Sequence, residues 1–111
     1  MQRFFTHTDL AHRHTDTNRR YLEFLRIPTM SAGLYVLPAG ATDDQRPHPE
    51  DEVYYILSGR GRFGVTTPEG EQDREVGPGD MILVLAHENH RFHGITEELA
   101  LLVVFAPAEA P

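Results

Sequence analysis

The sequence predicts a single all-β domain, folded as a sandwich or a barrel. Short runs of aliphatic, aromatic and β-branched residues recur along the 111 residues, and clusters of Pro, Gly and Ser separate them. Seven or more short strands at this spacing are typical of a β-sandwich or a β-barrel. The expected strands are residues 21–27, 33–37, 53–57, 62–67, 81–85, 91–95 and 99–105.

The same pattern divides the chain into three parts. Residues 1–20 have weak periodicity, so we expect an N-terminal arm that forms a loop, a short helical turn or an edge strand. Residues 21–106 hold the predicted strands and form the barrel. Residues 107–111 are a short Ala/Pro-rich tail, which we expect to be frayed.

Composition excludes several classes of function. The chain has no cysteine, so it forms no disulfide and any bound metal must be held by nitrogen and oxygen atoms. Its net charge is -7, with no basic stripe, which argues against a nucleic-acid surface. No apolar stretch reaches the roughly 18 residues of a membrane span, and the first residues do not resemble a signal peptide. We therefore expect a cytoplasmic protein that contacts neither nucleic acid nor membrane.

His48 and Glu52 stand close together in sequence at the start of an expected strand. On one straight strand they would lie roughly 13 Å apart, too far to share a metal ion. The intervening Pro49, Glu50 and Asp51 suit a turn, which can bring the two side chains together.

A second histidine, His90, follows the apolar run of residues 81–85 and a short turn. Alternation places His90 and Phe92 on one strand face and His93 on the other. His90 can therefore point into the barrel, toward His48 and Glu52.

At these residues the chain resembles the cupin superfamily, in its branch of small single-domain proteins with a jelly-roll β-barrel. The first cupin motif reads G-x5-H-x-H-x3-E-x6-G, and Gly40, His48, Glu52 and Gly59 match it. The second motif reads G-x5-P-x-G-x2-H-x3-N, and Gly79 and His90 match it. The resemblance implies a metal site whose ligands are His48, Glu52 and His90.

The chain departs from the first motif where the first histidine ligand is expected, because Arg46 stands there. Gln45 adjoins this place and can ligate a metal through its carbonyl oxygen, provided that a bulge or twist turns it inward. Arg46 itself has three readings: an anchor for an anionic substrate, an ion-pair partner of Glu52 in a metal-free barrel, or a surface arginine.

The predicted substrate pocket lies on the same strand faces as the ligands. Tyr54 and Ile56 lie two and four residues after Glu52, and Phe92 lies two residues after His90, so they share the strand faces of these ligands. His87 and Arg46 flank the site. Core packing explains the apolar members of this set equally well.

Two histidines and a carboxylate leave open coordination positions on one divalent ion, which the ligand types allow to be Zn, Fe, Mn or Ni. The resemblance implies a metal-dependent enzyme acting on a small organic molecule as a dioxygenase, an isomerase or a polyketide-cyclase-like protein. The alternative is a small-molecule binding or sensing module without turnover and possibly without metal. We also expect a homodimer, since residues 21–25 read as an edge strand.

Overall fold

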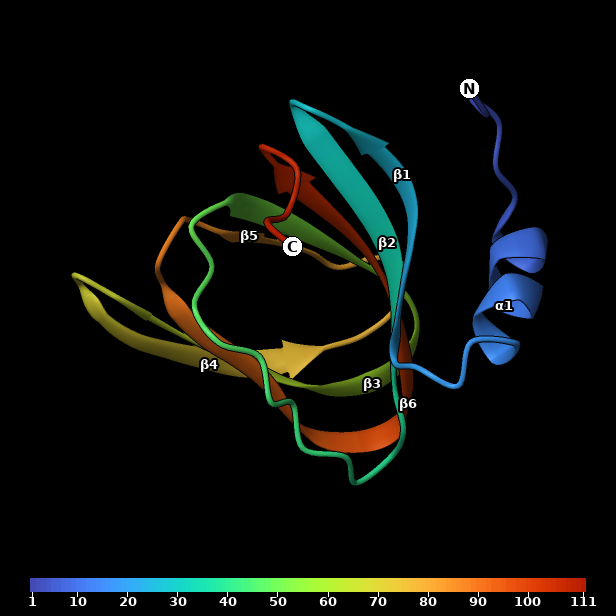
Figure 1. Ribbon diagram of the computed structural model, residues 1–111. Helices are drawn as coiled ribbons and strands as arrows, with labels where there is room; N and C mark the ends of the chain where they lie inside the picture. Colours follow the sequence, from blue (N-terminus) through green and yellow to red (C-terminus); the bar gives the residue numbers. More distant parts are fainter.

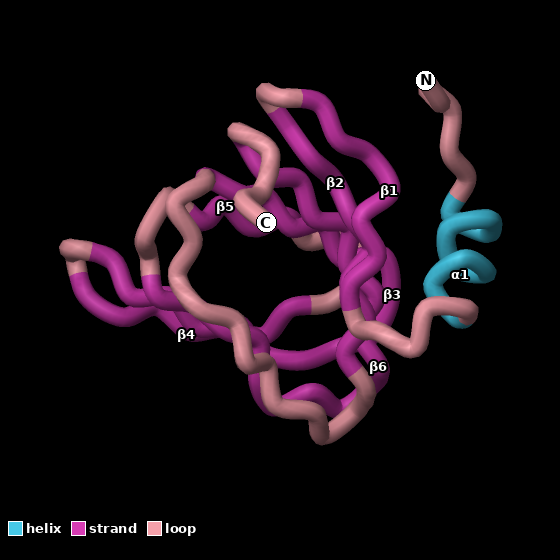
Figure 2. Tube along the Cα trace, in the orientation of Figure 1, coloured by secondary structure: helices cyan, strands magenta, loops and turns pink.

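The protein is described by a computed structural model that covers residues 1–111. It is mostly β, with one helix at the N-terminus (Figures 1 and 2). No helix has the length and hydropathy needed to span a membrane. The elements in chain order are α1 (His7–Thr15), β1 (Tyr21–Ile27), β2 (Met30–Leu37), β3 (Asp51–Thr67), β4 (Gly70–Val76), β5 (Met81–Val84) and β6 (Asn89–Ala106).

All strand pairs are antiparallel, in the order β1-β2-β6-β3-β4, with β5 paired to β3. The long strands β3 and β6 pass through both layers of the fold. The first part of β3 pairs with β5 and with the end of β6, whereas its second part pairs with β4 and with the start of β6. The sheet therefore folds over on itself and encloses an interior (Figure 1), which is the jelly-roll barrel that the sequence predicts.

Two pairs of expected strands are continuous in the structure. Residues 53–57 and 62–67 both belong to β3, and residues 91–95 and 99–105 both belong to β6. The glycine-rich segment between the first pair is a bent part of the strand, with register shifts between Ile56 and Arg62. Gly59 has φ +93°, and a Cβ there would lie 2.0 Å from the carbonyl oxygen of Glu98. Only glycine fits this corner, because any side chain would strike the partner strand.

Strand β4 is absent from the sequence prediction. Its sequence, GEQDREV, is polar, and every residue except Val76 is exposed. It forms a strand because its backbone pairs with β3 along the edge of the sheet, so tertiary context overrides its weak β propensity.

The core fills the space between the two layers and follows the strand alternation. Tyr54 and Ile56 from β3 are fully buried, as is Phe92 from β6, while Phe63 lies against Tyr54 and Phe92 with ring centroids 5.8 and 4.7 Å away. These side chains fix the position of the strands that carry the candidate site.

The N-terminal arm contains a true helix, α1, beside β1 and β2 (Figure 1). Thr6 caps it by accepting a hydrogen bond from the backbone N–H of Asp9, and Leu10 is its buried residue. The helix lies near β1 and β2.

The C-terminal tail lies against the barrel, although we expected it to fray. Its backbone N–H groups at Glu109 and Ala110 donate to the side chains of Ser31 and Glu50 at 2.9 and 3.0 Å. Arg26 donates to the carbonyl oxygen of Glu109. Hydrogen bonds to buried side chains therefore hold the tail, which the Ala/Pro composition does not reveal.

Candidate metal centre and adjoining cavity

Three parts of the chain contribute the candidate ligands. His48 lies in the loop between β2 and β3, Glu52 is the second residue of β3, and His90 is the second residue of β6. The chain bends at Pro49 and Glu50, just before Glu52, as expected, but His48 precedes the bend in a loop and not on a strand. The backbone N–H of His87 donates to the carbonyl oxygen of His48 at 2.6 Å, which ties the loop to the segment just before His90.

The structure brings these three side chains together. One donor atom from each of His48, Glu52 and His90 lies within 4.8 Å of the other two. Glu52 and His90 are 2% and 4% exposed, and His48 is partly buried. Because Glu52 belongs to one layer of the barrel and His90 pairs with Val65 in the other, the site bridges the two layers.

The converging atoms have no hydrogen-bond partners. His48 Nε2, both carboxylate oxygens of Glu52 and His90 Nε2 are buried and unpartnered. His90 Nε2 and Glu52 Oε1 are only 2.7 Å apart, yet their directions do not satisfy a hydrogen bond. Buried polar atoms without partners are costly in a folded protein, and a cation at their common point would satisfy all of them. The donor set fits a divalent ion.

The other ring nitrogen of His90 fixes which nitrogen can act as a ligand. Nδ1 lies 2.8 Å from the carbonyl oxygen of Glu88, and a carbonyl can only accept, so Nδ1 carries the proton. Nε2 of the neutral ring then has its lone pair facing Glu52 and His48. A backbone carbonyl behind a histidine is a common support for a metal ligand.

Charges near the site shift two pKa values. Burial alone would lower the pKa of His90, but the Glu52 carboxylate and the Glu88 carbonyl outweigh it, and the pKa is raised. Burial and the negative charge of Glu52 raise the pKa of Tyr54 well above its ordinary value. Tyr54 therefore stays protonated, and its hydroxyl donates to Gln45 Oε1 at 3.0 Å.

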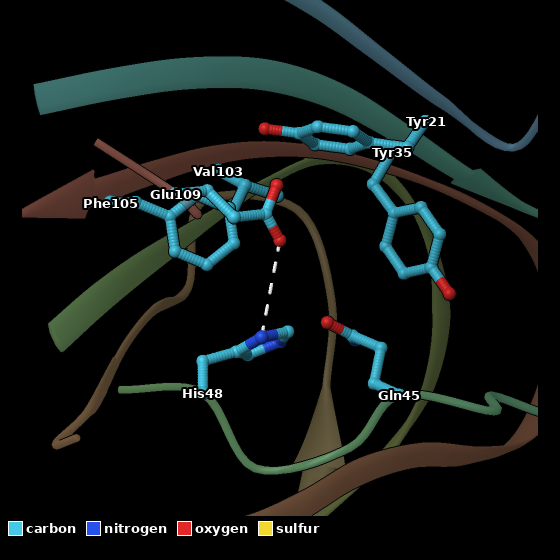
Figure 3. Close-up of a pocket in the computed structure, with 7 residues that line it drawn as sticks. All are labelled: Tyr21, Tyr35, Gln45, His48, Val103, Phe105 and Glu109. Atoms are coloured by element: carbon cyan, nitrogen blue, oxygen red, sulfur yellow. Dashed lines mark ion pairs between the residues drawn. The ribbon is translucent and has the colours of Figure 1, made fainter. Parts of the chain in front are cut away.

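Gln45 is held by a hydrogen-bond network around the buried carboxylate of Asp43. Its amide group donates to Asp43 Oδ2 at 3.0 Å, and Asp43 also accepts from the Tyr35 hydroxyl and the Phe92 backbone N–H. These contacts fix the amide orientation, so that the carbonyl oxygen Oε1 points toward His48 (Figure 3). The sequence did not single out Asp43, which reads as one of many acidic loop residues.

The residues expected to line a substrate pocket occupy other places. Arg46 and His87 are exposed and do not line the cavity beside His48, and no ion pair joins Arg46 to Glu52. Tyr54, Ile56 and Phe92 are fully buried in the core. The strand faces were correctly assigned, but these apolar side chains pack against one another and leave no space for a ligand.

A cavity of about 170 Å³ adjoins His48 on the side toward β1, β2 and the tail (Figure 3). Its lining residues are Tyr21, Tyr35, Gln45, His48, Val103, Phe105 and Glu109. Strand alternation predicts that Val103 and Phe105 lie on the same face of β6. Tyr21 and Glu109 reach the cavity through the packing of the chain ends, for which the sequence holds no local signal.

Glu109 is the acidic member of this lining. Its Oε2 lies 3.9 Å from His48 Nδ1, too long for a hydrogen bond (Figure 3). Burial and the carboxylates of Glu50, Glu52 and Glu23 raise the pKa of Glu109, against the opposing effect of Arg26. The cavity is therefore a region of negative potential next to the candidate ligands.

Comparison with protein families identifies a match to the cupin domain family. The model of the cupin domain family covers residues 33–105, which include the three candidate ligands. An uncharacterized protein of Streptomyces coelicolor is 48% identical over 90 residues, which are 81% of this chain and 82% of that protein.

An acireductone dioxygenase of Microcystis aeruginosa is 45% identical over 47 residues, 41% of this chain. This chain matches only 26% of the length of that enzyme.

Solved structures agree with the fold. A protein of Bacillus halodurans superposes with a TM-score of 0.78 at 20% identity, covering 99% of this chain and 85% of that one. The DMSP lyase DddQ of Ruegeria pomeroyi gives a TM-score of 0.67 at 24% identity, covering 82% of this chain and 49% of the lyase. At these identities the similarity concerns the fold alone.

Proposed function

The chain belongs to the cupin domain family, and we propose that it is a metal-dependent enzyme that acts on a small organic molecule in the cavity beside His48. The observation that carries the proposal is the set of four buried atoms on His48, Glu52 and His90 that converge on one point without a hydrogen-bond partner. In this proposal those residues hold one divalent ion, and Gln45 Oε1 is a fourth ligand in place of the histidine that Arg46 replaces.

The bound ion would supply Lewis-acid or oxygen chemistry at its open positions. The residues around the ion would bind the substrate and exclude water. Phe105, Val103 and Tyr35 would hold the apolar body of the substrate and exclude water, and Gln45 would be kept in orientation by Asp43.

Among the reaction classes, we favour dioxygenation. Two histidines and one carboxylate form the ligand set of many non-haem iron oxygenases. Relatives from two organisms are acireductone dioxygenases, although each matches this chain over less than half of its length. Isomerisation and cyclisation use the same donor set and remain within the proposal.

A metal-free binding module is the second candidate, and one observation favours it. His90 Nε2 and Glu52 Oε1 lie 2.7 Å apart, at a distance suited to an ion pair between a charged imidazole and a carboxylate. The attraction within a buried pair of this kind offsets part of the cost of burying each charge.

The test is the metal content of protein purified without a histidine tag. We expect about one equivalent of a divalent transition metal in the wild type, and a loss of affinity of at least about tenfold in His48→Ala and His90→Ala. His12→Ala is the matched control, because His12 lies exposed on α1. Equal metal content in all four proteins would contradict the assignment of the ligands.

We also propose a homodimer. Strand β1 stands at the end of the strand order, and an unpaired edge is usually covered in soluble proteins. Neighbouring residues on the outer face of β5 and β3, Met81, Leu83 and Tyr55, are 69%, 63% and 37% exposed. An exposed apolar row of this kind marks an interaction surface, and a second copy of the chain is the simplest partner.

A further inference from the structure

The cavity beside the candidate metal centre holds polar groups from both ends of the chain, outside the residues 33–105 that match the cupin family. Tyr21 comes from β1 and Glu109 from the C-terminal tail. Because these residues lie outside the shared family region, they are candidates for what distinguishes this chain's ligand.

Tyr21 is placed over the cavity by a glycine. A Cβ on Gly33 would lie 2.2 Å from the Tyr21 ring, so the ring occupies the space that any other residue at position 33 would fill. The ring meets Tyr35 and Phe105 edge-on, with centroids 6.2 and 6.4 Å away. The inner face of β2 is therefore shaped to receive this one phenol.

The Tyr21 hydroxyl is buried and has no hydrogen-bond partner. Burial and nearby carboxylates, Glu109 among them, raise its pKa, so it remains a protonated donor. A buried donor without a partner at the wall of a cavity suits an acceptor atom on a ligand that binds there.

Glu109 offers the complementary group. Its carboxylate accepts no hydrogen bond from the protein, and its backbone is fixed by bonds to Ser31 and from Arg26. A carboxylate on an anchored backbone, with no hydrogen bond from the protein and with His48 Nδ1 3.9 Å away, can accept from a hydroxyl donor on a ligand. Figure 3 shows this carboxylate directed at the His48 ring, across the opening that a ligand would occupy.

The charges around the cavity disfavour an anionic ligand. Its lining contains one carboxylate, Glu109, and no arginine, and Glu50 adds a second negative charge near Glu109. Arg46, the residue that could anchor an anion, is exposed and outside the lining. Like charges brought together at a binding site are a strong source of discrimination.

We propose that the cavity selects a small, planar, uncharged hydroxy compound over a carboxylate or phosphate, with Glu109 accepting from its hydroxyl group and Tyr21 donating to its oxygen. The flat apolar walls of Phe105, Tyr35 and Val103 suit the planar body. The assignment deepens the proposed function, since it names the substrate class of the same site.

The test compares two probes that differ mainly in charge, catechol and salicylate. Salicylate carries a carboxylate where catechol has its second hydroxyl group. Binding of each is measured by NMR titration at neutral pH, in Zn²⁺-loaded and in metal-free protein. We expect wild-type protein to prefer catechol by about tenfold in both forms. Because the metal-free protein is included, failure of the metal proposal would leave this test intact.

Glu109→Gln is expected to weaken catechol and strengthen salicylate, so that the preference shrinks by about tenfold. Glu97→Gln is the matched control, since it removes the same charge from an exposed residue that does not line the cavity. An unchanged ratio in Glu109→Gln, or the same change in Glu97→Gln, would overturn the proposal.

Tyr21→Phe separates a binding role from a structural one. Removing a hydroxyl that has no partner should leave the midpoint of denaturant unfolding unchanged or higher, while catechol affinity falls about fivefold to tenfold. A destabilised variant with normal catechol affinity would overturn the role of Tyr21. So would the absence of catechol binding to the wild type at millimolar concentrations.

Discussion

At the scale of single residues, Asp43 supports the site most directly. It is 6% exposed and accepts hydrogen bonds from Tyr35, Gln45 and the backbone of Phe92. These donors belong to β2, to the loop that carries His48 and to β6. One carboxylate therefore joins three segments next to the candidate ligands, and its loss would leave several buried donors without a partner.

We expect Asp43→Ala to lower the free energy of unfolding by about 2–4 kcal/mol, measured by urea denaturation. Asp44→Ala, one residue along and exposed, should change it by less than about 0.5 kcal/mol. Equal effects of the two substitutions would show that the Asp43 network contributes nothing.

A second carboxylate, Asp73, lies on the exposed face of β4. Desolvation acts to raise its pKa, but hydrogen bonds and charge from His93 and Arg62 outweigh this and lower it below the ordinary value. A lowered pKa means that the contribution to stability is present above the unfolded-state pKa, and disappears as pH falls through the folded-state pKa.

NMR titration should therefore give Asp73 a midpoint below that of an ordinary aspartate. Arg62→Gln should move that midpoint upward, because one of the two partners is lost. A midpoint that stays unchanged in this variant would mean that Arg62 does not contribute in solution.

At the scale of elements, the bent strands determine where the site forms. Glu52 and His90 meet because β3 and β6 each run through both layers, and Gly59 allows the bend of β3 against β6. Strand alternation predicted the inward faces of Glu52 and His90. It did not predict the continuity of the long strands, because Gly-rich segments read as turns when no partner strand is known.

Gly59→Ala tests the corner. With φ +93° and the Glu98 carbonyl 2.0 Å from the added Cβ, we expect a loss of about 3 kcal/mol or more in the free energy of unfolding. Gly70→Ala is the control, since φ is +120° there but no atom lies within 4 Å of the Cβ. This control should cost only about 1–2 kcal/mol, the strain of the backbone conformation. Equal losses of unfolding free energy in both variants would show that the contact with the Glu98 carbonyl does not require glycine at position 59.

At the scale of the whole molecule, the sequence was sufficient for the barrel and for His48, Glu52 and His90 as neighbours. Motif spacing placed these residues, and the fold depends on alternation that the sequence displays. The sequence did not predict the cavity, because its lining residues Tyr21, at the start of β1, and Glu109, in the C-terminal tail, come together only in the folded protein. The tail carries no pattern of its own, and its hydrogen bonds to Ser31 and Glu50 exist only in the folded protein.

The proposed dimer also belongs to this scale. Sedimentation equilibrium at micromolar concentration should give twice the chain mass of 12.6 kDa. Leu83→Glu should shift the equilibrium toward the monomer, because it places a charge in the exposed apolar row of β5. Thr96→Glu, an exposed position on β6 away from that row, should not. A monomeric wild type would contradict the dimer and leave the metal centre unaffected.

The metal centre is tested most directly by an anomalous-difference map, recorded from crystals of untagged protein at the absorption edge of the metal found by elemental analysis. We expect one peak at about 2.0–2.2 Å from His48 Nε2, His90 Nε2 and a carboxylate oxygen of Glu52. No peak there, with His90 and Glu52 joined in a direct ion pair in protein supplied with that metal, would contradict the metal centre.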